Sequence, residues 1–391
     1  MSSEIDIAVE GEVSPGFEAV QDAFAGNWNR IEVGASLTVF HGQTKVVDLW
    51  GGFRDPGCTL RWERDTLVNV YSTTKGLATI AVAILADRGQ LDFEAPVVDY
   101  WPAFGARGKG QVTVAQLLSH QAGLCGVTEP LEVEDLYDWD KMVSLLAAQE
   151  PLWPPGTAAG YHAITWGYLA GELVRRISGL SLGQYFQQEV AEPLGADVFI
   201  GLPDTEMHRV SDLIGPNRAR IQPQRSATQS ETPPLYRMAL ENPLVRPYKD
   251  ASSTAWRRAE IAAANGQANA RGIATAYAPM ACGGLWQGNR ILTEAGIEKV
   301  TRREVGDQID LVTGRPMRRS RGFILNTAGI YGPCDESFGH AGAGGSVGFA
   351  DPIHRIAFGY AMNQMEPDAA ATPRSKLLVD AVYRCLATVE T

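Results

Sequence analysis

A predicted strand meets a long predicted helix at Tyr71-Ser72-Thr73-Thr74-Lys75-Gly76. The run before this stretch is short and extended in character, and after it apolar residues recur at helical spacing, at Leu77, Ile80, Ala81, Ile84 and Leu85, until Gly89 supplies a stop. Because residues i and i+3 lie on one face of a helix, we expect the Lys75 amine to lie beside the Ser72 hydroxyl.

This pairing suits nucleophilic catalysis. Serine attacks only when a neighbouring base takes its proton, and a lysine can act as that base if its pKa falls from about 10.4 toward neutrality. The Ser72 N–H, at the positive end of the helix, is also a candidate oxyanion donor. The alternative is that Ser72 is an ordinary N-cap and Lys75 a solvated lysine, because short motifs of this kind are common. The apolar surroundings and two further motifs favour catalysis.

Those two motifs are Pro155-Gly156-Thr157 to Tyr161 and, near the C-terminus, His340-Ala341-Gly342. Together with Ser72 to Lys75, they resemble the three signature elements of the serine β-lactamase and penicillin-binding superfamily. The order and spacing are most similar to the branch related to class C β-lactamases, which includes the family VIII carboxylesterases. The resemblance covers roughly residues 15 to 388.

The resemblance implies that Tyr161 relays a proton between nucleophile, lysine and leaving group, and it leaves open whether Lys75 or Tyr161 is the primary base. Beside a lysine cation we expect the pKa of Tyr161 to fall from about 10. The β-lactamase pattern has an asparagine two residues after this tyrosine, whereas the present chain has Ala163. Efficient β-lactam hydrolysis is therefore not expected.

In the third motif, His340 replaces the lysine of the superfamily. Since histidine is largely neutral at pH 7, it would not pair with a penicillin or peptide carboxylate, and a neutral acyl substrate fits better. Gly342 is expected to let the substrate approach the backbone closely, and the Ala343 N–H matches the second oxyanion donor. A purely structural role for His340 is an equal alternative.

Two other candidates compete with this site. Ser346 lies in Gly344 to Gly348, which matches the GxSxG nucleophile elbow, but that elbow requires a helix after the strand, and the sequence after Ser346 predicts only strand. His120, after a predicted short helix, is a candidate base. We favour a role for His120 in ordering the helix end, because the Ser72 motif already contains an amine.

Composition narrows the function classes. The 391 residues are 45% hydrophobic, which suffices for a substantial core, and contain no apolar run long enough to span a membrane. The acidic N-terminus lacks the pattern of a secretory signal, so we expect a cytoplasmic protein. Five scattered cysteines predict neither disulfides nor a metal site. A net charge of −11 disfavours nucleic acid and anionic membranes as partners, and the basic run Arg315 to Arg321 is expected to be a solvated face.

Strand patterns occur near both chain ends, with mainly helical patterns between them, including one from Ala259 to Ala281. This arrangement predicts an α+β, β-lactamase-like fold: an antiparallel sheet built from both ends, flanked by terminal helices, with a large helical insertion. We expect a sheet domain of residues 1–100 and 275–391 and a helical domain of residues 101–274, with an irregular segment near 201–262 over the pocket.

The predicted function is a serine hydrolase of small carboxylic esters, with short acyl groups favoured. Ser72 would form an acyl-enzyme, Lys75 and Tyr161 would relay protons, and no cofactor or metal is required. A β-lactamase or D-alanyl peptidase at the same site is one alternative, and a non-catalytic binding module on this scaffold is another. The sequence leaves the oligomeric state, the physiological ester and the choice between hydrolysis and acyl transfer undetermined.

Overall fold

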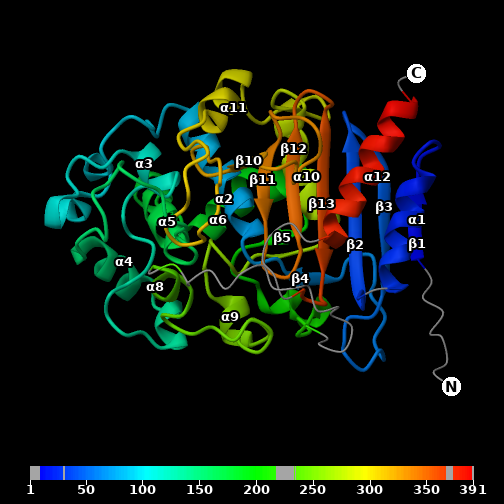
Figure 1. Ribbon diagram of the computed structural model, residues 1–391, viewed down its shortest axis with the longest axis horizontal. Helices are drawn as coiled ribbons and strands as arrows, with labels where there is room; N and C mark the ends of the chain where they lie inside the picture. Colours follow the sequence, from blue (N-terminus) through cyan, green and yellow to red (C-terminus); the bar gives the residue numbers. More distant parts are fainter. Residues whose placement is uncertain (1–8, 30, 217–232, 234, 367–372, 390–391) are drawn as a thin grey trace.

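The computed structural model describes residues 9–29, 31–216, 233, 235–366 and 373–389. Its largest element is a seven-stranded antiparallel sheet in the order β1-β3-β2-β13-β12-β11-β10 (Figure 1). The strands span Val9–Val13 (β1), Gly34–His41 (β2), Thr44–Gly52 (β3), Ile324–Leu325 (β10), Phe338–Ala341 (β11), Val347–Asp351 (β12) and Ile356–Met362 (β13). The two chain ends meet where β2 pairs with β13, which confirms the predicted α+β fold.

Helices cover both faces of this sheet. One face packs on α1 (Glu18–Gly26) and α12 (Pro373–Val389), with an apolar cluster beneath them that includes Phe24, Phe349 and Leu378. The other face packs on α10 (Ala270–Ala281) and on α2 (Thr73–Asp87), which contacts β11 and β12. Helix α2 is buried from Thr73 to Ala86 because it lies between the sheet and the helical part of the chain.

The helical part lies beyond the β10 edge of the sheet (Figure 1). Its helices are α3 (Val114–Leu118), α4 (Trp139–Ala148), α5 (Thr165–Ser178), α6 (Leu182–Phe186), the π-helical turn Gln187–Ala191, α7 (Glu192–Leu194), α8 (Tyr236–Leu240) and α9 (Thr254–Arg258). Helix α11 (Glu294–Thr301) packs on α2. A small second sheet has the order β5-β7-β4-β6, from Val198–Phe199, Gln267–Ala268, Leu67–Asn69 and Val210–Ser211, and β8 (Leu285–Trp286) pairs with β9 (Asn289–Arg290).

One expected helix is shorter than its sequence pattern. The alanine-rich run from Ala259 to Ala281 predicts a single helix, but α10 begins only at Ala270. Residues 259–268 instead form turns and strand β7. In this stretch Gly266 donates from its N–H to Thr74 Oγ1 at 2.9 Å and passes so close to α2 that a Cβ there would lie 2.6 Å from the same oxygen. The carbonyls of this non-helical stretch are consequently free to serve the site.

The irregular segment near 201–262 is partly described. Residues 217–232 and 234 of this segment lie outside the described residues. The described part contributes α8 and α9, and Leu235 and Leu240 pack in the same apolar cluster as Tyr161. None of the helices in the described ranges is both long and apolar enough to span a bilayer.

Candidate active site

Ser72 lies at the turn that joins β4 to α2 and is the N-cap of the helix. The residue before it, Tyr71, has a φ of +42°, a left-handed conformation that is rare for an aromatic residue. Contacts on both sides hold this turn: the Tyr71 hydroxyl donates to the Pro247 carbonyl, and Thr74 Oγ1 donates to the Tyr71 carbonyl. Such strained backbone commonly marks functional sites, and here it presents Ser72 half-buried at the helix start.

Three predicted site residues converge on one oxygen atom. The Tyr161 hydroxyl donates to Ser72 Oγ at 2.7 Å, and Lys75 Nζ lies 3.2 Å from the same oxygen. Lys75 comes from the first turn of α2, and Tyr161 follows the Pro-Gly turn that precedes α5. The side chains at 72, 75 and 161 therefore share a single hydrogen-bonded cluster.

The Lys75 amine is fully buried and has two backbone acceptors. Nζ donates to the Ala163 carbonyl at 2.7 Å and to the Ala263 carbonyl at 2.9 Å. Burial, with a smaller contribution from the Arg319 guanidinium, lowers the pKa of Lys75 well below its ordinary value. An uncharged amine has two N–H bonds and one lone pair. Its two N–H bonds are used by the carbonyls, and the lone pair is left for Ser72.

The predicted lowering of the Tyr161 pKa is wrong. Burial raises the pKa of Tyr161 to about 12 and outweighs the opposing effects of the Ser72 hydrogen bond and of Arg319. The expected cation is missing because the neighbouring Lys75 is itself driven toward its neutral form. The phenol is therefore protonated and acts as a donor to Ser72 Oγ.

Two histidines order the segment that carries Tyr161. The His162 N–H donates to Nδ1 of His120 at 2.9 Å, and His162 itself connects the Gly160 carbonyl (2.6 Å, through Nδ1) to the Leu124 N–H (3.1 Å, through Nε2). Burial lowers the pKa of both imidazoles, that of His162 to about 3. His120 also has a φ of +67°, and its ring lies 5.2 Å from the ring of Tyr161. These contacts support the ordering role rather than that of a base.

The third motif places a tight loop over the start of α2. A Cβ added to Gly342 would lie 2.1 Å from the Val70 carbonyl oxygen and 2.3 Å from Ser346 Oγ. Protein atoms therefore fill the space that a side chain at position 342 would need, and the close approach of substrate to the Gly342 backbone stays a prediction. Within the described part of the chain, the backbone N–H groups of Ser72 and Ala343 donate no hydrogen bond, as oxyanion donors require.

Ser346 has a structural environment. It is buried, donates from Oγ to the Val70 carbonyl at 2.8 Å, and shares a 3.0 Å hydrogen bond with Thr73 Oγ1. Its own carbonyl accepts the Gly342 N–H at 2.8 Å. The residues that follow form strand β12, as predicted, so there is no nucleophile elbow. Ser346 fastens the Gly342 loop to the turn before α2.

His340 is neutral, as expected, but is deeper than a surface substrate contact. Its side chain is buried in β11, its ring lies 6.2 Å from the ring of Tyr161, and Nδ1 lies 2.8 Å from the Ala341 carbonyl. Burial lowers the pKa of His340 to about 3. No described residue bonds to its Nε2.

One charged pair beside the site was not predicted. Arg319 and Asp310 are buried and paired, with Arg319 Nη2 2.5 Å from Asp310 Oδ2. The prediction that residues 315–321 form a solvated face is thus wrong for Arg319, and also for Arg321, which pairs with Glu304 and Glu94. A basic run in a sequence does not show which of its members finds a buried carboxylate.

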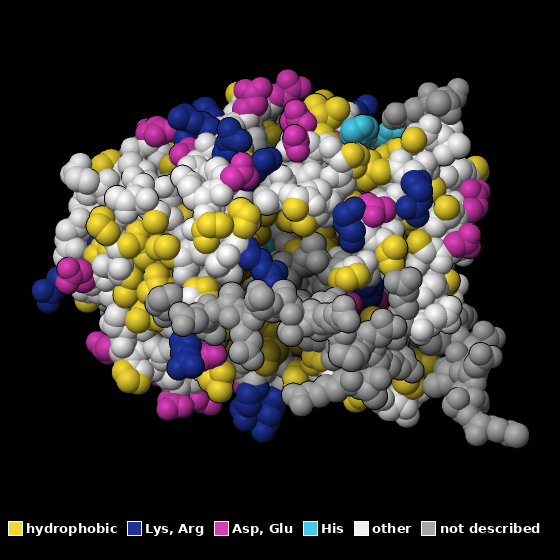
Figure 2. Space-filling view, in the orientation of Figure 1, with side chains coloured by type: hydrophobic (Ala, Val, Ile, Leu, Met, Phe, Trp, Pro, Cys, Tyr) yellow, Lys and Arg dark blue, Asp and Glu magenta, His cyan; other side chains and the backbone are white. Residues whose placement is uncertain are grey.

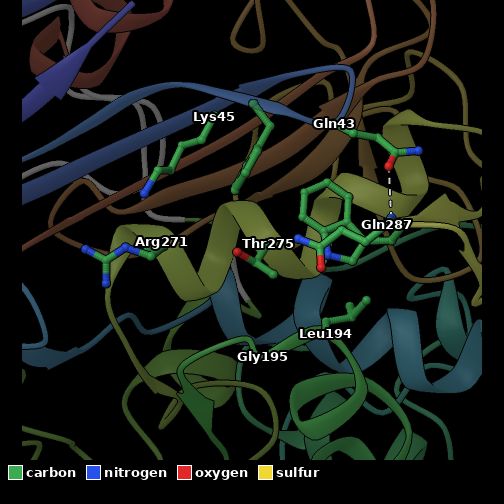
Figure 3. A pocket seen from close by; sticks show the side chains of 9 residues that line it. Gln43, Lys45, Leu194, Gly195, Arg271, Thr275 and Gln287 are labelled. Carbon is green, nitrogen blue, oxygen red and sulfur yellow. Dashed lines mark hydrogen bonds between the residues drawn. The ribbon is translucent and has the colours of Figure 1, made fainter.

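One side of Tyr161 packs in an apolar cluster. Its cluster contains Trp153, Val312, Leu235, Leu240 and Leu311, and hydrophobic side chains also gather on the helical part in Figure 2. A separate cavity of about 340 Å³ opens between the β2–β3 hairpin and α10, lined among others by Gln43, Lys45, Arg271 and Thr275 (Figure 3). Lys45 and Arg271 both pair with Asp48, and no site residue lines this cavity.

Three described residues outside the site could ligate a metal. The ligand atoms of Cys334, Asp351 and His354 lie within 4.8 Å of one another, although the sequence spacing of the cysteines gave no such signal. Asp351 already accepts hydrogen bonds from the Tyr383 hydroxyl (2.6 Å) and is paired with His354 Nδ1 (2.8 Å). Cys334 Sγ donates to Glu336 Oε2 at 3.2 Å, so all three side chains have protein partners.

Comparisons with known proteins bear on the family and the fold of this chain. Residues 20–382 match the family described as Beta-lactamase. A solved structure described as a family VIII carboxylesterase is 48% identical, covers 97% of this chain and 100% of that chain, and superposes with a TM-score of 0.90. A penicillin-binding protein homolog from Caulobacter crescentus is 38% identical, with a TM-score of 0.87 and coverage of 97% and 100%. The esterase/beta-lactamase LipL of Mycobacterium tuberculosis is 34% identical over 91% of this chain and 83% of its own length.

Proposed function

Because the chain belongs to the Beta-lactamase family, we propose that it is a serine carboxylesterase that cleaves small neutral esters through an acyl-enzyme on Ser72. One observation supports this proposal above the others. Ser72 Oγ is hydrogen-bonded both to the Lys75 amine, whose pKa burial lowers, and to the protonated phenol of Tyr161. The amine can accept the serine proton, and the phenol can donate one.

The proton transfers follow from these two states. Lys75 takes the proton of Ser72 as Oγ attacks the ester carbonyl, and the N–H groups of Ser72 and Ala343 bind the oxyanion. Tyr161 then protonates the departing alkoxide, and Lys75 returns the proton to the Tyr161 oxygen. In the second half of the reaction, water gives a proton to Lys75 and attacks the acyl carbonyl. The bond to Ser72 Oγ then breaks, Ser72 regains its proton from Tyr161, Lys75 reprotonates Tyr161, and the acid is released. Lys75 is the primary base in this scheme.

Two residues favour an ester over a lactam or a peptide. Ala163 offers a methyl group where the superfamily has the asparagine amide, and His340 is neutral and buried where the superfamily has a lysine. The nearby cation Arg319 is also buried and already paired with Asp310. A substrate carboxylate would therefore find no exposed positive partner among these residues. The apolar side chains around Tyr161 fit a short acyl group, and the cytoplasmic location stays a prediction.

The test compares esters with a lactam. Wild-type protein should hydrolyse p-nitrophenyl acetate and butyrate, with slow or no opening of a chromogenic cephalosporin. Ser72→Ala should abolish ester cleavage and labelling by a fluorophosphonate. Ser144→Ala, an exposed serine on α4, is the matched control and should behave as wild type.

Ser346→Ala separates the two serine candidates. It should weaken activity, because the Gly342 loop loses its fastening, but should leave Ser72 labelled. Faster turnover of the cephalosporin than of the esters would favour a β-lactamase. A label on Ser346 would refute the site, and esterase activity that survives Ser72→Ala would refute the acyl-enzyme.

A further inference from the structure

The Arg319–Asp310 pair is buried without being fully hydrogen-bonded. The side chains are 1% and 0% exposed. Asp310 Oδ1 accepts the N–H groups of Val312 (2.9 Å) and Thr313 (2.7 Å), so the carboxylate is well supplied with donors. Among the described residues, Arg319 Nε and Nη1 have no partner. A buried ion pair adds little net stability, so its retention calls for another explanation.

The Arg319 end of the pair, and not the Asp310 end, faces the site. The Arg319 guanidinium carbon lies 5.9 Å from the centroid of the Tyr161 ring, and Lys75 Nζ lies 4.8 Å from the same centroid. The carboxylate of Asp310 is bound instead by the backbone of its own loop. That loop is tied to the Tyr161 segment, because the Leu311 N–H donates to the Ala159 carbonyl at 3.0 Å. The positive end of the pair thus lies against the catalytic tyrosine.

Other groups around Lys75 do not supply a fixed charge. His120, His162 and His340 have lowered pKa values and are neutral, and Tyr161 is protonated. In the described ranges no carboxylate pairs with Lys75, whose acceptors are two backbone carbonyls beside the Ser72 oxygen. The Arg319–Asp310 pair is therefore the charged neighbour to consider.

We propose that Arg319 is a positioning residue: held by Asp310, it supplies the fixed positive charge that keeps the Lys75 amine unprotonated and able to accept the proton of Ser72. This inference rests on the proposed function. It is supported by the pKa values of Lys75, His120 and His340, each of which Arg319 lowers in addition to the effect of burial.

The size of the effect can be bounded. The guanidinium carbon of Arg319 and Lys75 Nζ can be no farther apart than the sum of their distances to the Tyr161 centroid, which is about 11 Å. At that separation, with an effective dielectric constant of about 20, the charge of Arg319 lowers the pH at which Lys75 titrates by about one unit. Removing the positive charge makes Lys75 easier to protonate. The pH below which activity is lost should then rise.

The experiment measures kcat/KM for p-nitrophenyl butyrate against pH. Arg319→Gln should move the acid limb of the profile upward by about one pH unit. Asp310→Asn should move it downward, because the positive charge then acts alone, and the double variant should lie between them. Arg318→Gln is the matched control, since Arg318 pairs with the exposed Asp307, and it should leave the limb in place.

Opposite shifts distinguish this role from damage to the fold, which lowers activity without moving the limb in two directions. A folded Arg319→Gln protein with an unmoved limb would overturn the inference. If the Arg319→Gln variant does not fold, the Asp310→Asn variant decides the question. An acid limb of Asp310→Asn that stays in place or moves to higher pH overturns the inference equally. Arg319→Lys should bring the limb back toward wild type. Absence of Ser72-dependent esterase activity in the wild type would instead overturn the proposed function.

Discussion

Replacing Gly342 by alanine should cripple the site without removing any catalytic group. The new Cβ would lie 2.1 Å from the Val70 carbonyl oxygen and 2.3 Å from Ser346 Oγ, whereas ordinary contacts begin at 3.4 Å. The loop must therefore withdraw by about 1 Å, carrying the Ala343 N–H with it, and a misplacement of that size costs on the order of 100-fold in rate. Because the Val70 atom is backbone, a side-chain rotation cannot relieve the clash.

The assay is kcat and KM on p-nitrophenyl butyrate together with the melting temperature. We expect the loss mainly in kcat, since an oxyanion donor acts in the transition state. Gly110→Ala is the control, because no atom lies within 4 Å of its would-be Cβ and the variant should match wild type. Adding Ser346→Ala to Gly342→Ala should not rescue activity, because the Val70 contact remains. A Gly342→Ala protein with wild-type kcat would refute this account of the loop.

Two further predictions concern the proton relay. Tyr161→Phe removes the donor to Ser72 Oγ and should lower kcat/KM on the order of 10²- to 10⁴-fold with a small change in melting temperature; a rate within threefold of wild type would exclude the relay. Lys75→Met tests whether the protonation of Lys75 is linked to folding. Because the pKa of Lys75 is lowered in the folded protein, below about pH 10 the unfolded chain binds a proton at Lys75 that the folded protein does not. The free energy of unfolding of the wild type therefore rises with pH up to about pH 10. The melting temperature of Lys75→Met relative to wild type should therefore fall from pH 7 to pH 10, and a constant difference would show that Lys75 is charged in the native protein.

Sequence periodicity was enough to find Ser72 and Lys75, because one helical turn fixes their relation. Tyr161 could be found only through the resemblance, since a lone tyrosine after a turn carries no spacing signal. The backbone groups that bind the Lys75 amine could not be predicted from the sequence. The Ala263 carbonyl is a backbone atom in a stretch whose composition predicts helix, and it reaches Lys75 only because β7 and Gly266 interrupt that helix.

The charged partners were missed for another reason. Arg319 stands among several arginines, and only the tertiary pairing with Asp310 separates it from its half-buried neighbour Arg318. The error on the Tyr161 pKa has a related origin. Sequence places the phenol beside a lysine, but burial decides which of the two groups is charged, and burial is a property of the packed molecule.

The pairing of β2 with β13 has a consequence for biosynthesis. As the nascent chain leaves the ribosome, the β2–β3 hairpin emerges first, and its partner between Ile356 and Met362 follows only after all the residues between Gly52 and Ile356 have been translated. Until then that edge of β2 has unpaired backbone groups, which invite association with other chains. High-level expression should therefore depend on chaperones that shield this edge, and chains that stop before Ile356 should aggregate.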